Sequence, residues 1–501
     1  MTPYGSPRRT VPLVVLAIVA AVPAAVSASL WRLAEARLPT ADELVVVPTV
    51  PAFGAAPVEL LPTPLLSYRR QPVLIARRVE ASRVDEELAR RVESLSSEFG
   101  DRLAGSPGAT GCLRVEIGGD LVADVGTGLR VVPASTQKLL IAAVAIDVLG
   151  PDFRYRTEVR SMPPLAGVVT GDVVLVGGGD PVLVSDGFVD PQRHPAFNTT
   201  SLDRLADQVV AAGVTVIDGA VVGDGSRYDD EFRAPSWGPG ITNFDAGPYD
   251  ALLVDDGFLS DGNHGIVPAR SAAARFVDLL RERGVTVRDG AANQDRAPLE
   301  GETVLAVVES APLSDILVEM LHTSDNNTAE MVLKEIGATA RGIGAREVGL
   351  DVVRARLTDW AIDAADLVLA DGSGLSRVNQ IGCDALTAVL GSVPVSSALV
   401  DLLPAAGRDG TLSTRLLGTP AEGRLRGKTG TLTGVKALAG EQPDREGRPV
   451  VFAVVMNGDG VEDPSVHEPV WNEIVRFIDD LPISVDLDAD EFGPGRSATG
   501  S

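Results

Sequence analysis

Residues 133–139 read Pro133-Ala134-Ser135-Thr136-Gln137-Lys138-Leu139 and open an apolar stretch that runs to Leu149. The Leu, Ile, Ala and Val residues after Lys138 predict a strongly apolar helix from Ser135 to Leu149. Residues i and i+3 share a helix face, so the Ser135 hydroxyl and the Lys138 amine can approach each other. The first turn of a helix carries free N–H groups and partial positive charge, which disfavours a cationic amine. Lys138 is therefore a candidate base and Ser135 a candidate nucleophile, against the alternative of an N-capping serine and a surface lysine.

A second motif, Ser324-Asp325-Asn326, follows 189 residues after Ser135 and lies between two predicted helical stretches within residues 312–337. A serine hydroxyl and an asparagine amide on one short loop can relay a proton and hold a substrate amide. The alternative interpretation of these residues is a turn that ends in a helix cap.

The third motif, Lys428-Thr429-Gly430-Thr431, enters a strand predicted over residues 431–439. The lysine supplies positive charge, the threonine hydroxyls can bind a carboxylate, and Gly430 lets a substrate lie against the strand edge. The chain has 40 arginines and only four lysines, which are Lys138, Lys334, Lys428 and Lys436. Arginine cannot replace an amine that must lose its proton. Two of the four lysines lie in these motifs, which favours a catalytic role for the motifs over a purely structural one.

Taken together and in this order, the three motifs resemble the signature of serine β-lactamases and penicillin-binding proteins. The long interval between the first two motifs resembles the class C low-molecular-mass penicillin-binding proteins, the D-alanyl-D-alanine carboxypeptidase/endopeptidase family, which carry a large insertion there. Other segments look like boxes of the same family: Glu330 after the second motif, Asp371–Arg377, and Gly179-Asp180-Pro181.

The resemblance implies a serine-type carboxypeptidase that acts on peptidoglycan stem peptides ending in D-Ala-D-Ala, is acylated by β-lactams and needs no cofactor or metal. By position it makes Ser135 the acylated nucleophile and Lys138 its base. Ser324 and Asn326 would pass a proton to the leaving D-alanine and orient the peptide. Lys428 and Thr429, beside Gly430 and Thr431, would hold the terminal carboxylate, and the N–H groups of Ser135 and Thr431 would form an oxyanion hole. The balance between carboxypeptidase and endopeptidase activity stays open, as does the role of Asp371–Arg377.

The expected fold is a mixed α/β core like that of β-lactamases and transpeptidases, with an antiparallel sheet and helices, split by an inserted α+β domain. We expect the core at residues 79–160 and 305–485 and the insertion at residues 161–304. Residues 32–78 are rich in proline and read as an extended tether, and residues 486–501 read as a loose acidic tail.

The N-terminus predicts export from the cytoplasm. Arg8 and Arg9 precede an uncharged run from Val11 to Trp31. Residues 1–31 are thus either a cleaved signal peptide, with a cleavage site after Ala28, or an uncleaved membrane anchor. Outside the cytoplasm Cys112 and Cys383 can form a disulfide, but two separate buried thiols fit the sequence as well.

Composition and motif details exclude other functions. The net charge of −25 opposes nucleic-acid binding, and two cysteines cannot build a zinc ribbon or an iron–sulfur site. The phosphate-binding loop motif needs four residues between its two glycines, but only three residues separate Gly423 from Gly427 before Lys428. A His-dependent hydrolase lacks its Gly-x-Ser-x-Gly turn. A β-lactamase-like hydrolase and a catalytically idle cell-wall-binding protein remain as alternatives.

Overall fold

The computed structural model describes residues 71–106, 108–188, 197–238, 241, 245–259, 262–294 and 299–481. The predicted signal or anchor at residues 1–31 and the tail at 486–501 lie outside them. The described chain begins with helix α2, Gln71–Ala104, so residues 71–78 are helical where we expected an extended tether. Pro72 stands in the first turn, where proline is tolerated, and no proline follows it in the helix. Within these residues, no helix combines the length and the apolarity of a membrane span.

The first sheet is antiparallel and has the strand order β13-β14-β15-β1-β2. Its strands are β1 Thr110–Ile117, β2 Asp120–Val125, β13 Arg426–Leu432, β14 Val435–Pro443 and β15 Pro449–Asn457. Residues 431–439, expected to be one strand, are divided between β13 and β14. Gly434, at φ 70°, supplies the left-handed backbone conformation that the tight turn between these two strands requires.

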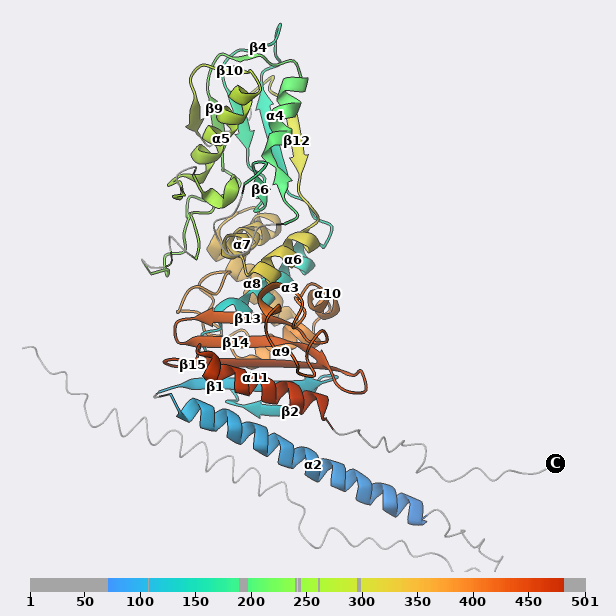
Figure 1. The fold of residues 1–501 in the computed structure, drawn as a ribbon. Coiled ribbons are helices and arrows are strands. Elements are labelled where there is room, and N and C mark those ends of the chain that lie inside the picture. Colours follow the sequence, from blue (N-terminus) through green and yellow to red (C-terminus); the bar gives the residue numbers. More distant parts are fainter. Residues whose placement is uncertain are drawn as a thin grey trace, which may run out of the picture. The chain divides into compact units, whose positions relative to one another are not determined.

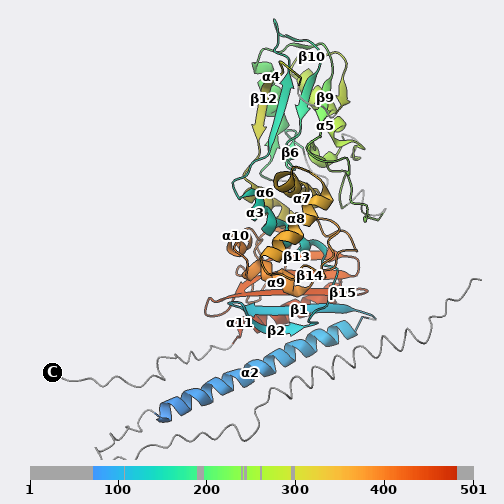
Figure 2. The ribbon, with the colours of Figure 1, turned by 180° about the vertical axis from the view of Figure 1, so that it is seen from behind.

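Helices cover both faces of this sheet (Figures 1 and 2). Leu438 on β14 contributes to a core with α2 and α11, Pro464–Asp479, whereas its neighbours Ala437 and Ala439 face a core with α3 and α9. Successive strand residues point to opposite faces, so this alternation assigns each side chain of β13 and β14 to one layer. The helices on the second side are α3 Lys138–Leu149, α6 Leu313–Thr323, α7 Asn326–Arg341, α8 Arg346–Asp359, α9 Cys383–Gly391 and α10 Ser396–Asp401.

A second, mixed sheet has the order β11-β9-β5-β3-β12 and its own apolar core against α4 and α5 (Figure 1). Strand β3 follows α3 in the chain, and β12 leads into α6. The sheet and its helices are β3 Arg156–Ser161, β5 Val173–Val176, β9 Val221–Asp224, β11 Ala291–Asn293, β12 Thr303–Glu309, α4 Leu202–Ala211 and α5 Pro268–Glu282. Two small parallel sheets join β10-β8-β4 and β6-β7, at β4 Val168–Val169, β6 Leu183–Val184, β7 Thr200–Ser201, β8 Val216–Ile217 and β10 Thr286–Val287.

A disulfide joins Cys112 on β1 to Cys383 at the start of α9. The sequence left this pairing open, because the two residues stand 271 positions apart. In the fold, α9 packs on the face of the sheet to which Cys112 points, and the two Cα atoms lie 5.9 Å apart. The bond therefore fastens a helix of the second layer to the sheet.

Candidate active site

Ser135 and Lys138 lie at the start of the most apolar helix of the core. Residues Ala134–Gln137 form a short 3-10 turn, and α3 begins at Lys138. The expected helix start at Ser135 is thus a tighter turn, which keeps the i,i+3 pair on one side. The Lys138 side chain is fully buried, and its Nζ lies 3.1 Å from Ser135 Oγ. The sequence spacing alone predicted this contact.

Lys138 Nζ has two further partners, the Asn326 side-chain oxygen at 2.7 Å and the Ser373 backbone carbonyl at 2.7 Å. Both oxygens can only accept, so the amine must donate one N–H hydrogen bond to each of them. A neutral amine has two N–H donors and one lone pair. Once the donors serve Asn326 and Ser373, the lone pair is left for the Ser135 hydroxyl.

Burial sets the charge of this amine. Desolvation lowers the pKa of Lys138 to about 8, while the negative charges of Asp325, Asp371 and Glu330 oppose that shift. A lysine with an ordinary pKa is charged at neutral pH and cannot accept a proton. Lys138 therefore holds a usable fraction of neutral amine near pH 7–8, as a general base needs.

The second motif connects two helices. Ser324 follows α6 in the left-handed region at φ 66°, and the Asp325 side chain caps α7 by accepting the Thr328 N–H at 2.5 Å. This sharp corner sends Asn326 toward Lys138 and Ser324 toward Lys428, whose Nζ donates to Ser324 Oγ at 2.9 Å. The corner thus links the first and third motifs.

The third motif lies on β13, an edge strand of the first sheet. The Gly427 N–H points away from β14, because it donates to Pro404 O at 3.1 Å. The N–H groups of successive residues point to opposite edges of a strand, so those of Thr429 and Thr431 face the same outer edge as the N–H of Gly427. A side chain at Gly430 would lie 3.1 Å from Ser135 N and 2.8 Å from Pro133 O. The missing side chain lets the strand edge approach the turn that carries Ser135.

Lys428 is as deeply buried as Lys138. Its pKa lies well below the usual lysine range, first because of desolvation and then because of the nearby charges of Lys138 and Lys436. Its Nζ also donates to Thr429 O at 2.9 Å, while Thr429 Oγ1 lies 2.8 Å from Thr411 Oγ1. Adjacent residues of β13 thus project to opposite faces, lysine toward the helices and threonine toward the loop that contains Thr411.

The segment 371–377 is the element of the site whose role the sequence left open. The buried Asp371 carboxylate accepts the N–H groups of Gly374 at 3.0 Å and Ser376 at 2.6 Å, and folds the segment into a compact turn. Glu330, also buried, accepts the Ser373 N–H at 2.7 Å. These two carboxylates aim the Ser373 carbonyl at Lys138. The boxes at Glu330 and Asp371–Arg377 were visible in the sequence, but not the direction of this carbonyl.

Residues between β9 and α5 also reach the site, which sequence reasoning missed. Trp237 Nε1 donates to the Asp371 carboxylate at 2.8 Å, and the Asn326 amide donates to Asp245 O at 2.5 Å. Asn326 is thereby held from two sides, with its oxygen on Lys138 and its nitrogen on Asp245. In the described part of the chain, no three His, Cys, Asp or Glu side chains are grouped so that they could hold a metal ion.

Comparisons with known proteins agree with this arrangement. The family model of the D-Ala-D-Ala carboxypeptidase 3 (S13) family matches residues 103–262 and 266–481. A D-alanyl-D-alanine carboxypeptidase from an Actinomadura species is 32% identical and aligns over 66% of this chain and 74% of its own length. The carboxypeptidase DacB of Mycolicibacterium smegmatis is 33% identical, over 67% of this chain and 73% of its own.

Among solved structures, penicillin-binding protein 4 of Haemophilus influenzae is similar in fold, with a TM-score of 0.65 and 22% identity. The similarity covers 76% of this chain and 98% of that one. The same Haemophilus protein in complex with a β-lactam has a TM-score of 0.61 and 21% identity, over 75% of this chain and 99% of that one.

Proposed function

The chain belongs to the S13 family of D-Ala-D-Ala carboxypeptidases, and we propose that it shortens peptidoglycan stem peptides through an acyl-enzyme on Ser135. It is a serine-type hydrolase and a penicillin-binding protein by family. The observation that carries the residue assignment is the position of Lys138 Nζ, which lies between Ser135 Oγ, the Asn326 oxygen and the Ser373 carbonyl.

In the proposed acylation step, the Ser135 hydroxyl gives its proton to the neutral Lys138 amine while its oxygen attacks the carbonyl carbon before the terminal D-alanine. The carbonyl oxygen becomes an oxyanion. We assign its stabilisation to the N–H groups of Ser135 and Thr431, since β13 passes beside the turn that carries Ser135 at Gly430 and the Thr431 N–H faces the outer edge of the strand.

The tetrahedral intermediate then breaks its carbon–nitrogen bond, and the leaving D-alanine amine needs a proton. We assign that delivery to Ser324, whose hydroxyl accepts a hydrogen bond from Lys428 and relays the proton that Lys138 took from Ser135, so that Ser324 is again a hydroxyl and Lys138 is again neutral. Asn326 orients the peptide from the other side of the loop. Lys428 and Thr429 hold the terminal carboxylate. Water next attacks the Ser135 ester with Lys138 as base, which frees the shortened peptide and restores the hydroxyl.

Intact mass spectrometry with a penicillin tests the nucleophile. We expect the wild-type protein to gain the mass of one penicillin, and digestion to place it on Ser135. The variant Ser135→Ala should neither gain that mass nor release D-alanine from a D-Ala-D-Ala peptide. Labelling of Ser135→Ala would show that another residue is acylated.

The variant Lys138→Arg tests the base. A guanidinium stays protonated, so this variant should lose nearly all acylation although it keeps the positive charge. Turnover at the wild-type rate would refute Lys138 as the base. The lifetime of the wild-type penicillin adduct separates the alternatives, because a β-lactamase-like hydrolase clears it quickly and an idle wall-binding protein never forms it.

The protein works in the cell envelope, outside the cytoplasm. We propose that residues 1–31 direct its export and that the insertion predicted at residues 161–304 forms a domain of its own. Its sheet also contains β3 and β12, so the domain extends beyond the predicted bounds to residues 156 and 309. The disulfide between Cys112 and Cys383 supports an oxidising compartment. Mass spectrometry of the purified protein would show whether cleavage after Ala28 leaves it secreted or an intact N-terminus keeps it anchored.

A further inference from the structure

Lys436 is a lysine to which the proposed mechanism gives no role. Lys138 and Lys428 belong to the site, and Lys334 pairs with the Asp229 carboxylate at 2.6 Å. Lys436 is 6% exposed, and its Nζ donates to Thr431 Oγ1 at 2.9 Å. Among the described residues, no carboxylate oxygen lies within 4.0 Å of that ammonium. A buried cation without a counter-charge is costly, so this one points to an anion that comes from outside the chain.

The sheet register places Lys436 beside the residues that we propose to hold the substrate carboxylate. Lys436 lies directly opposite Thr431, so both side chains project from the same face. Thr429 stands two residues before Thr431 and shares that face, whereas Lys428 projects from the other side to Ser324. Lys436 thus supplies positive charge on the face that carries both threonine hydroxyls.

We propose that Lys436 is a specificity-determining residue, which neutralises the free terminal carboxylate of the substrate next to the hydroxyls of Thr429 and Thr431. An ammonium has three donors, and Thr431 uses one of them, which leaves two for a carboxylate oxygen. This inference rests on the proposed function. It adds a reason why a peptide with a free carboxyl end would be preferred to one whose end is blocked.

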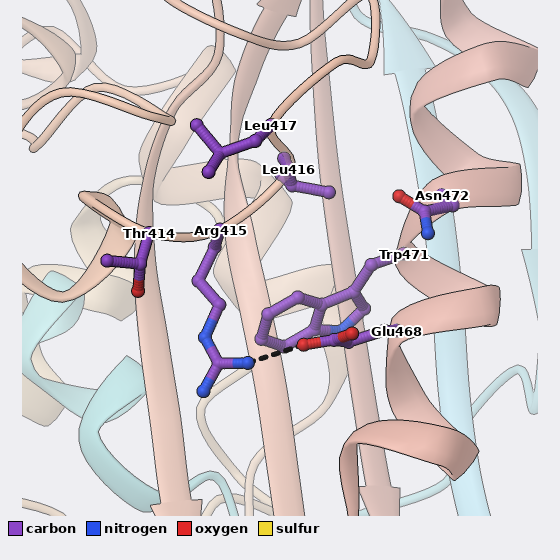
Figure 3. Close-up of a pocket in the computed structure, with 7 residues that line it drawn as sticks. All are labelled: Thr414, Arg415, Leu416, Leu417, Glu468, Trp471 and Asn472. Carbon is purple, nitrogen blue, oxygen red and sulfur yellow. Dashed lines mark hydrogen bonds and ion pairs between the residues drawn. The ribbon is translucent and has the colours of Figure 1, made fainter.

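The surroundings hold Lys436 in place without neutralising it. Its Nζ lies 5.2 Å from the centre of the Trp471 ring. Trp471 also lines a cavity of about 210 Å³ with Arg415 and Glu468, which form an ion pair at 2.5 Å (Figure 3). The Glu468 carboxylate therefore pairs with Arg415 and forms no ion pair with the Lys436 ammonium.

The other charged groups around Lys436 come from several elements. Glu462 accepts the Gly434 N–H at 3.0 Å, and Lys428 and His467 lie close enough for their pKa values to be lowered by Lys436. Desolvation first, and then the charge of Arg415, lowers the pKa of Lys436 to about 8 against the pull of Glu468 and Glu462. The side chain is accordingly a cation at neutral pH.

The test compares two peptides that differ only at the carboxyl end, one with D-Ala-D-Ala as the free acid and one as the terminal amide. For each, kcat/KM is measured for release of D-alanine or D-alanine amide by the wild-type protein, Lys436→Met and Lys436→Arg. Methionine fills a similar volume and packs well on an indole ring, so the strand should keep its structure. The variant Arg476→Met is the matched control, because it removes an exposed cation from α11, the helix that also carries Trp471.

We expect Lys436→Met to lose at least about tenfold in kcat/KM for the acid, chiefly through KM, and less than about threefold for the amide. Lys436→Arg and Arg476→Met should keep the preference for the acid. An equal loss for both peptides in Lys436→Met, or an unchanged preference, would overturn the proposal. Labelling of Ser135 by a fluorescent penicillin is measured in every variant, because loss of labelling in the wild-type protein would instead refute the proposed function. Competition of the two peptides against this label gives the same preference as a ratio of affinities.

Discussion

The Glu330 carboxylate accepts a hydrogen bond from the Ser373 N–H at 2.7 Å, and the carbonyl of the same Ser373 accepts one from the Lys138 amine. A buried acid thus holds the backbone of Ser373 through its N–H, while the carbonyl oxygen of the same residue orients the amine of Lys138. Glu330 stands one helical turn after Asn326 on α7, so a single helix supplies both a direct and an indirect partner of Lys138.

Replacement of Glu330 by glutamine should change how stability depends on pH. Burial first, and then the charge of Asp371, raises the pKa of Glu330 to about 7. The folded state therefore binds the proton more tightly than the unfolded state, and stability falls as pH rises from about 4.5 to about 7. Glutamine cannot ionise, so the Glu330→Gln variant should not show the loss of about 2–4 kcal/mol in the free energy of unfolding that we expect of the wild-type protein across this pH range. Urea unfolding at pH 4.5 and pH 8 measures the difference.

Glu98→Gln is the control for this measurement, since Glu98 lies on the partly exposed surface of α2 and pairs with Arg102. It should keep the pH dependence of the wild-type protein. If the free energy of unfolding changes with pH in the same way in Glu330→Gln and in the wild-type protein, Glu330 is not the group that titrates.

The rate of acylation should rise with pH through about 8. Only the neutral amine of Lys138 can take the Ser135 proton, and burial lowers the pKa of this amine to about 8. Stopped-flow measurement of penicillin acylation from pH 6 to pH 10 should give about a tenfold increase per pH unit below that value and a plateau above it. A flat profile over this range would mean that Lys138 is not the base in the rate-limiting step.

Gly374 should not tolerate a side chain. It has φ 86°, and an added Cβ would lie 2.1 Å from Ala134 O, in the turn that presents Ser135. Gly374→Ala must therefore move that turn, and we expect acylation to fall by about a hundredfold or more. The measurement is the second-order rate constant for labelling by a fluorescent penicillin.

Gly118→Ala is the matched control for Gly374→Ala, because Gly118 also has positive φ, at 59°, but an added Cβ there meets nothing within 4 Å. It should cost about 1–2 kcal/mol of stability and leave acylation unchanged. Equal acylation in the two variants would refute the steric argument.

The disulfide should contribute about 2–4 kcal/mol to stability, since it closes a loop of 271 positions in the unfolded chain. The double variant Cys112→Ala/Cys383→Ala should show this loss in urea unfolding, and reduced wild-type protein should unfold at a similarly low urea concentration. If dithiothreitol leaves the wild-type transition in place, the bond does not stabilise the protein. The same treatment should not shift the double variant.

Local sequence patterns predicted the short-range geometry of the site well. The contact between Ser135 and Lys138 follows from a spacing of three residues at the start of a helix, and the corner at Ser324–Asn326 follows from two flanking helical stretches. The limits of the elements were less accurate, as residues 71–78 and 431–439 show. A left-handed Gly434 ends β13 and starts β14, while the apolar pattern runs on through the turn.

Long-range partners could not be predicted in this way. Asp371 accepts a hydrogen bond from Trp237, which is 134 positions away in the sequence, and Cys112 forms a disulfide with Cys383, which is 271 positions away. The charge state of Lys138 and the isolation of Lys436 also depend on which carboxylates the fold brings near them. The amino-acid order alone therefore indicates which groups can do the chemistry, because helix and strand periods act over a few residues. Where those groups meet, and with what charge, depends on packing between distant segments, because burial and Coulomb interactions arise only once the layers have assembled.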